Sequence, residues 1–472
     1  MNKNSPNDKP IRSKLLAILT DLDRSFLLKF QKKLLKEGSP KRDIVLVFNY
    51  CLKYHPNYDQ PALNQQYAYQ KIFKGPFDYV RLMRGISNIF LRLKQFLSEQ
   101  ELVENPFLKS YLLAQAYNRH HLSSSFQQLV SKKTNSSINT SSIETSLEQL
   151  LWNHLAYFSG TDTKTVTKHS VLSTSNSALN IYFVAIKLRY LCEFANRKNL
   201  LKEEYSDKFE ESILCFCEQE NKNLPPLCQL YWLAYQLIIQ KEEVVFKEFK
   251  QLYLEKWCTL SKEDQVILLT YLLNYAAGEI RRNNTIYVEL IFQLYQFGID
   301  KEIFLINERF IADHFVNIIY ISSSLNEFDW IDGLLNKWEQ QISVWLAPSI
   351  FNLSMARLTF AEGLFIKCKT HLLKVDRNNY IYAFRAKMLE IACAYELKDP
   401  IFSIQAQCKA FENYLRRYKD KHGDNVVGGL NFISMMRQLL KVQPCKKHLL
   451  LLFNDYELIL FPKWLLEKIE EV

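Results

Sequence analysis

From about residue 179 to the C-terminus, the sequence is a succession of apolar helical segments that occur in pairs. The turns expected within these pairs fall near residues 241, 283, 327, 363 and 399, at intervals of 42, 44, 36 and 36. A single pair of helices of this length has too little apolar surface for a core of its own, whereas stacked pairs bury a continuous one. The spacing therefore predicts an α-solenoid.

The composition agrees with an all-α fold. Glycine and proline number only 11 and 13 among 472 residues. A many-stranded sandwich or barrel needs turns every few residues, and a nucleotide-binding α/β domain needs glycine-rich phosphate loops. The scarcity of both residues argues against these classes of fold.

The sequence also predicts where the protein works. No apolar run reaches the roughly 18 residues of a membrane helix. The N-terminal stretch "MNKNSPNDKPIRSKLLAILTD" lacks the long apolar core and small-residue cleavage site of a secretory signal. The ten cysteines follow no disulfide framework. We therefore expect a cytoplasmic protein with reduced thiols and no membrane association.

Three regions are expected along the chain. Residues 1–122 form a basic N-terminal helical domain, and residues 179–472 form the helical-repeat domain. Between them, residues 123–178 are expected to form Ser/Thr-rich loops around one helix, because two stretches (131–146 and 159–178) are rich in Ser, Thr and Asn.

The positive charge lies in the first fifth of the chain. Residues 1–97 contain 18 Lys and Arg against 7 Asp and Glu, and the remainder contains 42 against 43. The segment 77–97 of this basic region has the spacing of an amphipathic helix. Its expected buried face carries Val80, Met83, Ile86, Phe90, Leu93 and Leu97.

The opposite, polar face of that helix suggests a nucleic-acid reader. It carries Arg81, Arg84, Asn88, Arg92 and Gln95. Helix-turn-helix proteins present Arg, Asn and Gln to DNA from one helix in this way. The alternative is an ordinary solvated face of a lysine-rich protein, and the sequence favours this alternative because such faces are common.

No local motif points to catalysis. The chain contains no phosphate-binding glycine loop, no nucleophile elbow and no HExxH zinc motif. Cys215, Cys217 and Cys228 could suggest zinc, but no fourth ligand lies nearby, and Cys215 and Cys217 would point to different faces of the helix "ESILCFCEQ". We therefore expect a non-enzyme without metal or cofactor.

Two resemblances bear on the fold. Residues 349–375 look like a divergent tetratricopeptide repeat, with small residues Ala356, Gly363 and Cys368 where two helices approach closely and Leu372 at a large apolar position. Further segments resemble a group of large, uncharacterised bacterial helical-repeat proteins: residues 71–97, 325–330, 351–363, 415–419, 430–441 and 464–471. These resemblances imply an irregular tetratricopeptide-like solenoid and no particular activity.

The expected function is a non-catalytic scaffold for protein–protein interaction. Solenoids present the first helix of each pair along a concave surface that can hold a peptide or helix. The candidate groove residues are polar or aromatic residues on those first helices: Tyr235, Asn274, Asn317, Asn352, Arg357 and Arg385. The alternative is a nucleic-acid-binding regulator, in which residues 1–97 read nucleic acid and the solenoid senses a partner.

Overall fold

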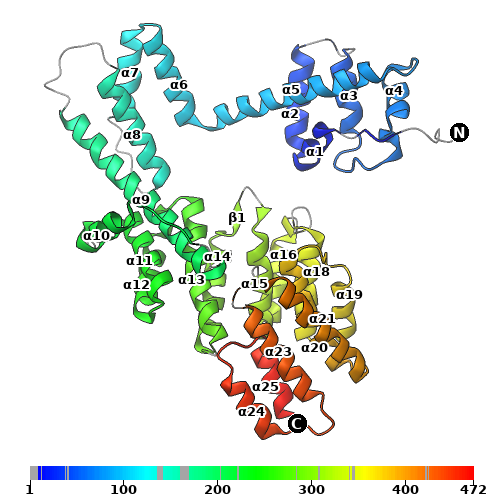
Figure 1. Ribbon diagram of the computed structural model, residues 1–472. Coiled ribbons are helices and arrows are strands. Elements are labelled where there is room, and N and C mark those ends of the chain that lie inside the picture. Colours follow the sequence, from blue (N-terminus) through cyan, green and yellow to red (C-terminus); the bar gives the residue numbers. More distant parts are fainter. Residues whose placement is uncertain are drawn as a thin grey trace. The chain divides into compact units, whose positions relative to one another are not determined.

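The computed structural model confirms the all-α class, because helices make up 79% of it (Figure 1). The residues it describes are 9–11, 13–37, 39, 42–134, 142–159, 169–201, 204–220, 223–282, 284–306, 309–339, 341–342, 346–419, 423 and 425–472. Within these, strand structure amounts to one antiparallel pair, β1 (Leu305–Ile306) and β2 (Arg309–Phe310), with Leu305 opposite Phe310.

The chain divides into two compact units, Met1–Asn135 and Ser136–Val472. The helices of the first unit are α1 (Lys14–Asp21), α2 (Arg24–Glu37), α3 (Asp43–Leu52), the 3-10 helix η1 (Pro61–Leu63), α4 (Gln65–Phe73), α5 (Tyr79–Glu104), α6 (Pro106–Arg119) and α7 (Ser123–Thr134).

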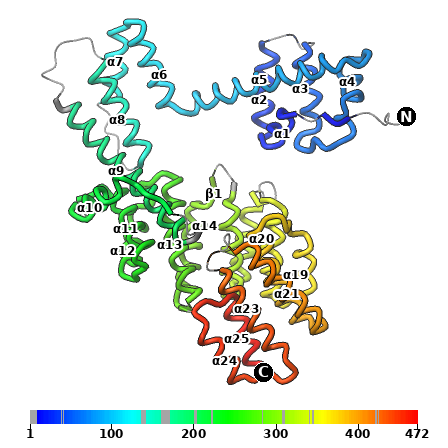
Figure 2. Tube along the Cα trace, viewed as in Figure 1, coloured from blue at the N-terminus to red at the C-terminus, as the bar shows by residue number. Residues whose placement is uncertain are grey.

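The helices of the second unit follow in the same order along the chain (Figure 2). They are α8 (Ile143–Phe158), α9 (His169–Leu201), α10 (Glu210–Glu220), α11 (Pro226–Gln240), α12 (Glu243–Lys256), the 3-10 helix η4 (Trp257–Thr259), α13 (Lys262–Arg281), α14 (Ile286–Asp300), α15 (Ala312–Ser324), α16 (Phe328–Lys337), α18 (Pro348–Ala361), α19 (Phe365–Leu372), α20 (Tyr380–Glu396), α21 (Ile401–Arg417), α23 (Asn425–Leu439), α24 (Lys446–Asp455) and α25 (Pro462–Glu470).

The first unit is built around α5, which packs against α1 and α3. Asp78 caps its N-terminus by accepting a hydrogen bond from the Arg81 backbone NH. The fully buried residues of α5 are Leu82, Gly85, Ile86, Ile89, Leu93 and Phe96. The predicted face agrees with this core in part: Ile86 and Leu93 are buried, and Met83, Phe90 and Leu97 pack against the core while partly buried. Val80, the remaining residue of the predicted face, is exposed.

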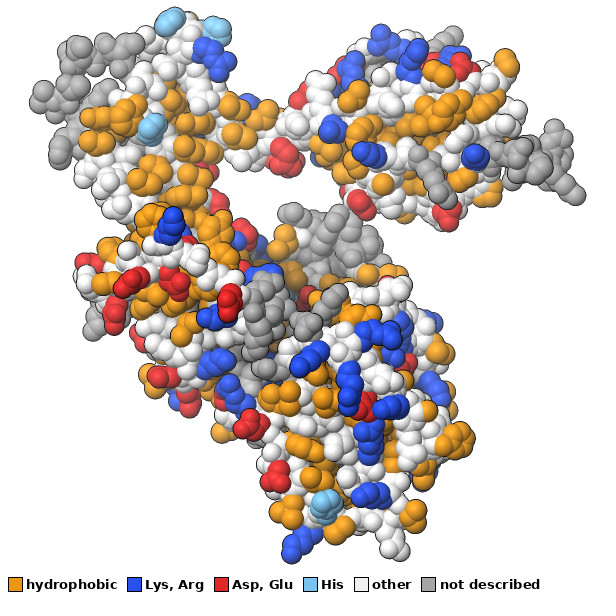
Figure 3. All heavy atoms as spheres, viewed as in Figure 1, with side chains coloured by type: hydrophobic (Ala, Val, Ile, Leu, Met, Phe, Trp, Pro, Cys, Tyr) orange, Lys and Arg blue, Asp and Glu red, His pale blue; other side chains and the backbone are white. Residues whose placement is uncertain are grey.

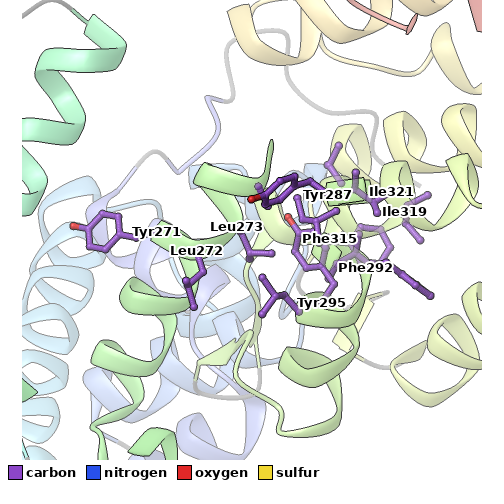
Figure 4. Packing of buried hydrophobic residues seen from close by; sticks show 14 of the residues in the cluster. Tyr271, Leu272, Leu273, Tyr287, Phe292, Tyr295, Phe315, Ile319 and Ile321 are labelled. Atoms are coloured by element: carbon purple, nitrogen blue, oxygen red, sulfur yellow. The ribbon is translucent and has the colours of Figure 1, made fainter. Parts of the chain in front are cut away.

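The second unit has one continuous hydrophobic core that extends from Ile143 to Ile469. Figure 4 shows part of this core, where side chains of α14 and α15 such as Phe292 and Phe315 pack together. Most consecutive helices of the unit are neighbours in space, and α11 also packs against α13, α15 against α18, and α18 against α20. The predicted turns agree with the structure, since each of the five falls between two consecutive helices.

Three of these turns share one backbone geometry. Asn326, Gly363 and Lys398 have positive φ angles and lie 37 and 35 residues apart. Each is followed by a residue whose NH donates across the turn to a carbonyl five residues earlier, as Leu364 does to Thr359 at 2.8 Å. Left-handed backbone at the end of a helix usually takes glycine or asparagine, so Lys398 is an unusual residue for this position.

The Ser/Thr-rich region is more helical than predicted. Helix α9 begins at His169, so the prediction of a loop over residues 159–178 is wrong for residues 169–178. Residues 142–146 also belong to a capped helix start, in which the Ser142 side chain accepts from the Thr145 NH. The predicted loop residues 135–141 and 160–168 lie outside the described part of the chain.

The C-terminal helix α25 folds back against earlier helices of the unit. The Trp464 indole NH donates to the Glu396 carboxylate of α20 at 2.6 Å, and its ring lies 6.2 Å from the ring of Phe360 in α18. The Lys463 ammonium donates to the Ser324 carbonyl at the end of α15. Helix α25 therefore covers part of the surface formed by the first helices of three pairs.

Among the residues that the structure describes, none of the helices combines the length and the apolarity needed to cross a bilayer.

Candidate binding groove on the first helices of the pairs

Three of the six predicted groove residues lie in one cluster. Asn317 is on α15, Arg357 on α18 and Arg385 on α20, so each comes from the first helix of a different pair. An Nη2 atom of Arg385 donates to the Asn317 side-chain oxygen at 2.9 Å. The Tyr320 ring acts electrostatically on both arginines. We call Asn317, Tyr320, Arg357, Arg385 and Phe461 the arginine cluster.

Arg357 is held between two aromatic rings. Its guanidinium carbon lies 4.4 Å from the ring centre of Tyr320 and 4.3 Å from that of Phe461. A guanidinium over an aromatic face is attracted by the ring quadrupole. Two aromatic rings therefore pack on the guanidinium of Arg357.

Two NH groups of this guanidinium lack an acceptor among the described residues. The Nε and Nη1 atoms of Arg357 are shielded from solvent, and no described residue accepts a hydrogen bond from either. No acidic side chain of the described residues lies within ion-pair distance of Arg357 or Arg385. Burial lowers the pKa of both guanidinium groups, yet arginine stays protonated in proteins. The cluster therefore carries two positive charges without a directly paired acid among the described residues, and the carboxylates of Glu467 and Asp313 act on them from a greater distance.

More polar groups surround Arg385 than surround Arg357. The exposed carboxylate of Asp313 and the hydroxyl groups of Tyr295, Tyr320 and Tyr382 act on its charge, with Asp313 the strongest of them. Burial raises the pKa of Tyr295, and a hydrogen bond with Asn317 opposes that shift. Asn317 therefore connects Arg385 of α20 with Tyr295 of α14, which Figure 4 shows within the core.

The other three predicted groove residues lie elsewhere. Tyr235 is buried, and its hydroxyl donates to Glu210. Asn352 is also buried, and its side chain joins the Pro348 carbonyl and the His371 ring within one helix pair. Asn274 is exposed on α13. Tyr235 and Asn352 therefore bond to neighbouring helices or to their own. The faces of α11 and α18 that carry them do not contribute to the arginine cluster.

Sequence reasoning missed the aromatic half of the cluster. Phe461 is more than a hundred residues from Arg357 in sequence and precedes α25 in a left-handed backbone conformation, with φ 60° and ψ 44°. Tyr320 follows Asn317 by three residues on α15, so helical spacing could have paired these two. No local pattern could have placed Phe461 beside Arg357.

The polar face of α5 is exposed, as its spacing predicts, but much of it is already engaged. Arg81 donates twice to Asp43, with both distances at 2.7 Å, and also lies over the Phe73 ring. Arg92 pairs with Glu37 at 2.6 Å, and Gln95 donates to Glu99.

Two residues of that face, Arg84 and Asn88, are exposed and have no such partner among the described residues. The observed pairs of Arg81, Arg92 and Gln95 mean that most of the predicted reader would have to exchange internal partners for phosphates or bases.

A second basic surface lies on the outer side of α20 and α21, where Figure 3 shows Lys and Arg side chains gathered. Arg377, Lys387 and Arg417 line a hollow of about 290 Å³ there, together with Tyr414 and Tyr418. Arg377 pairs with Glu390, and the Lys387 ammonium lies over the Tyr414 ring. Of these three charges, Arg377 has an acidic partner and Lys387 an aromatic one.

The cysteines give no sign of a metal centre. Cys217 and Cys228 are buried while Cys215 is exposed, so the first two cysteines of the motif do point to different helix faces. Burial raises the pKa of the Cys217 and Cys228 thiols to about 12, which favours the neutral form over a metal-binding thiolate. Within the described ranges, no three His, Cys, Asp or Glu side chains are grouped as a metal site.

Comparisons with protein-family models, with curated proteins and with solved structures found no match for this chain. The arginine cluster, with its observed distances, is therefore the strongest guide to function.

Proposed function

We propose that the protein is a non-catalytic, cytoplasmic scaffold that binds a peptide or helix of a partner protein. In this proposal the second unit is an irregular tetratricopeptide-like solenoid, like the bacterial helical-repeat proteins that segments of the sequence resemble. The first helices of its pairs form the binding groove. The observation that carries the proposal is the pair of arginines on α18 and α20 that lack an acidic partner.

The reasoning starts from the cost of those arginines. A shielded NH group without an acceptor disfavours folding, and hydrophobic residues of similar size would fill the same space at lower cost. The presence of Arg357 and Arg385 on the first helices of successive pairs is expected if a bound partner supplies the acceptors. The helical repeats supply a rigid support, since the core of the unit is continuous.

A pull-down with the full chain, followed by mass spectrometry with and without nuclease, tests the proposal. We expect a protein partner that survives nuclease and is weakened when Asn317 and Arg385 are changed to Ala together. Arg282→Ala is the matched control, because Arg282 is an exposed arginine of the same unit that pairs with Glu279. Equal recovery by the double variant and by wild type would contradict the groove.

The alternative proposal, a nucleic-acid-binding regulator, draws support from the exposed Arg84 and Asn88 in the basic first unit. Binding through phosphates weakens steeply as salt rises. In this alternative the full chain shifts duplex DNA or RNA at low salt, and Arg84→Ala weakens the shift. Absence of a shift at low salt rules it out.

A further inference from the structure

We infer that the arginine cluster receives an oxyanion carried by a peptide, either a carboxylate or a phosphorylated side chain. This inference rests on the proposed function, because it names the chemical group that the protein-binding groove would recognise. Nothing in the sequence resemblances points to it; it follows from how Arg357 is surrounded.

The surroundings of Arg357 restrict how a ligand can approach it. The rings of Tyr320 and Phe461 lie 4.4 and 4.3 Å from the guanidinium carbon, so a ligand must reach the NH groups from directions that these rings leave uncovered. A guanidinium has two paired edges in its plane, Nε with Nη2 and Nη1 with Nη2. Nε and Nη1 both lack an acceptor among the described residues, so each edge offers an unsatisfied donor to an incoming oxygen.

The chemistry of these edges selects an oxyanion. Carboxylate and phosphate oxygens match the spacing of guanidinium NH groups and accept two hydrogen bonds side by side. A neutral carbonyl would leave the two positive charges of the cluster uncompensated. Arg385 adds the second charge, and its bond to Asn317 orients it.

Phe461 supports this assignment. Its positive φ of 60° places a non-glycine residue in the left-handed region, which costs free energy. The conformation places the Phe461 ring over Arg357 at the start of α25. Such strain is typical of residues that hold a binding group in position.

Isothermal titration calorimetry with the full chain at low ionic strength tests the inference. The probes are a short acidic peptide with a free C-terminus, the same peptide with Gln and Asn in place of its acids and an amidated end, a phosphoserine peptide, and inorganic phosphate. We expect an acidic or phosphorylated peptide to bind and the neutral peptide to give no heat. The stronger of the two binding peptides identifies the source of the oxyanion.

Variants then locate the binding. Arg357→Met and Arg385→Met should each lower the association constant at least about tenfold, since a charge-assisted hydrogen-bonded pair is lost. Arg357→Lys keeps the charge but lacks the paired edges, so we expect it to bind as weakly as Arg357→Met. Arg282→Met is the control and should bind like wild type, because its partner Glu279 lies outside the cluster.

Several outcomes overturn the inference. They are no heat from any anion, equal binding of the neutral peptide, or an equal loss in Arg282→Met. The failure of the proposed function remains distinguishable. If recovery of a partner depends on Asn317 and Arg385 while no anion binds, the proposed scaffold is supported and the oxyanion site is contradicted. If anions bind and no protein partner depends on these residues, the site stands without the scaffold.

Discussion

In the first unit, Arg81 and Arg92 lie on the surface of α5 and reach the carboxylates of Asp43 and Glu37. In the second unit, Arg357 and Arg385 lie within a cluster of aromatic and amide side chains, and neither has an acidic partner. The sequence suggests the opposite, because the basic excess lies in the first 97 residues and the remainder is nearly neutral.

This difference teaches that net charge is a weak guide to where a partner binds. A charge that an internal acid already neutralises contributes little free energy to ligand binding. A shielded charge without an acidic partner contributes more, because the ligand supplies its first counter-charge. The comparison can be tested because all seven tryptophans lie between residues 152 and 464, within the second unit. Tryptophan fluorescence therefore follows the unfolding of that unit alone.

The largest effect is expected at Asp264, which is fully buried between α11 and α13. It accepts from the Tyr231 hydroxyl at 2.5 Å and from the Ser261 hydroxyl at 2.8 Å. Asp264→Ala leaves a buried hydroxyl without an acceptor and should lower the free energy of unfolding by about 3 kcal/mol. Asp264→Asn keeps an acceptor and should cost about 1 kcal/mol. Equal losses in both variants, measured by urea titration, would show that the bond to Tyr231 is unimportant.

The next effect is a pH dependence at Glu412, which connects α21 with α23. Hydrogen bonds from Arg437 and Arg416 lower the pKa of this carboxyl to about 2. Because the folded pKa lies below that of the unfolded chain, near 4.3, the stabilisation is complete above about pH 4.5 and disappears as pH falls toward 2. The free energy of unfolding of Glu412→Gln, followed by tryptophan fluorescence, should therefore fall less than that of wild type between about pH 4.5 and 2. Glu248 is an exposed acid on α12, and the free energy of unfolding of Glu248→Gln should fall with pH as it does in wild type.

A smaller effect, of opposite sign to most core substitutions, is expected at Arg357. Arg357→Met removes two shielded donors without acceptors and keeps contact with two rings, so the free energy of unfolding without ligand should stay equal or rise by up to about 1 kcal/mol. The matched control Arg437→Met breaks the bond to Glu412 and should lower it by about 1–2 kcal/mol. A loss at Arg357 as large as that at Arg437 would mean that Arg357 serves stability and not binding.

The smallest effect belongs to the surface pair of the first unit. Asp43→Ala removes the partner of Arg81, and an exposed ion pair contributes only about 0.5 kcal/mol. Hydrogen exchange read by mass spectrometry on peptides of α3 and α5 should show little change in protection. Strong deprotection there would show that this pair is as important to its unit as Asp264 is to the other.

The sequence predicted the helices and turns well because both depend on local patterns. The paired segments and the turns near 327, 363 and 399 coincide with observed helix ends. The stretch 169–178 was missed because Ser and Thr are common in loops, although α9 continues through them. The predicted face of α5 packs on the core except for Val80, and the packing of α1 and α3 decides which apolar residues of the helix are covered completely.

The candidate site was only half predictable. Asn317, Arg357 and Arg385 were found because polar residues recur on the first helices of the pairs. The rings of Tyr320 and Phe461 are what turn Arg357 into a site, and Phe461 arrives through the return of α25, a contact between distant parts of the chain. Periodicity within single helices carries no information about such a contact.

The return of α25 also has a consequence for the order in which the site is made. A ribosome synthesises Arg357 about a hundred residues before Phe461, so during synthesis the guanidinium is stacked on one ring only. A protease that cuts within the segment between α24 and α25 would return it to that half-covered state without touching any helix of the groove. Cleavage that removes the last dozen residues should therefore also abolish ligand binding at Arg357.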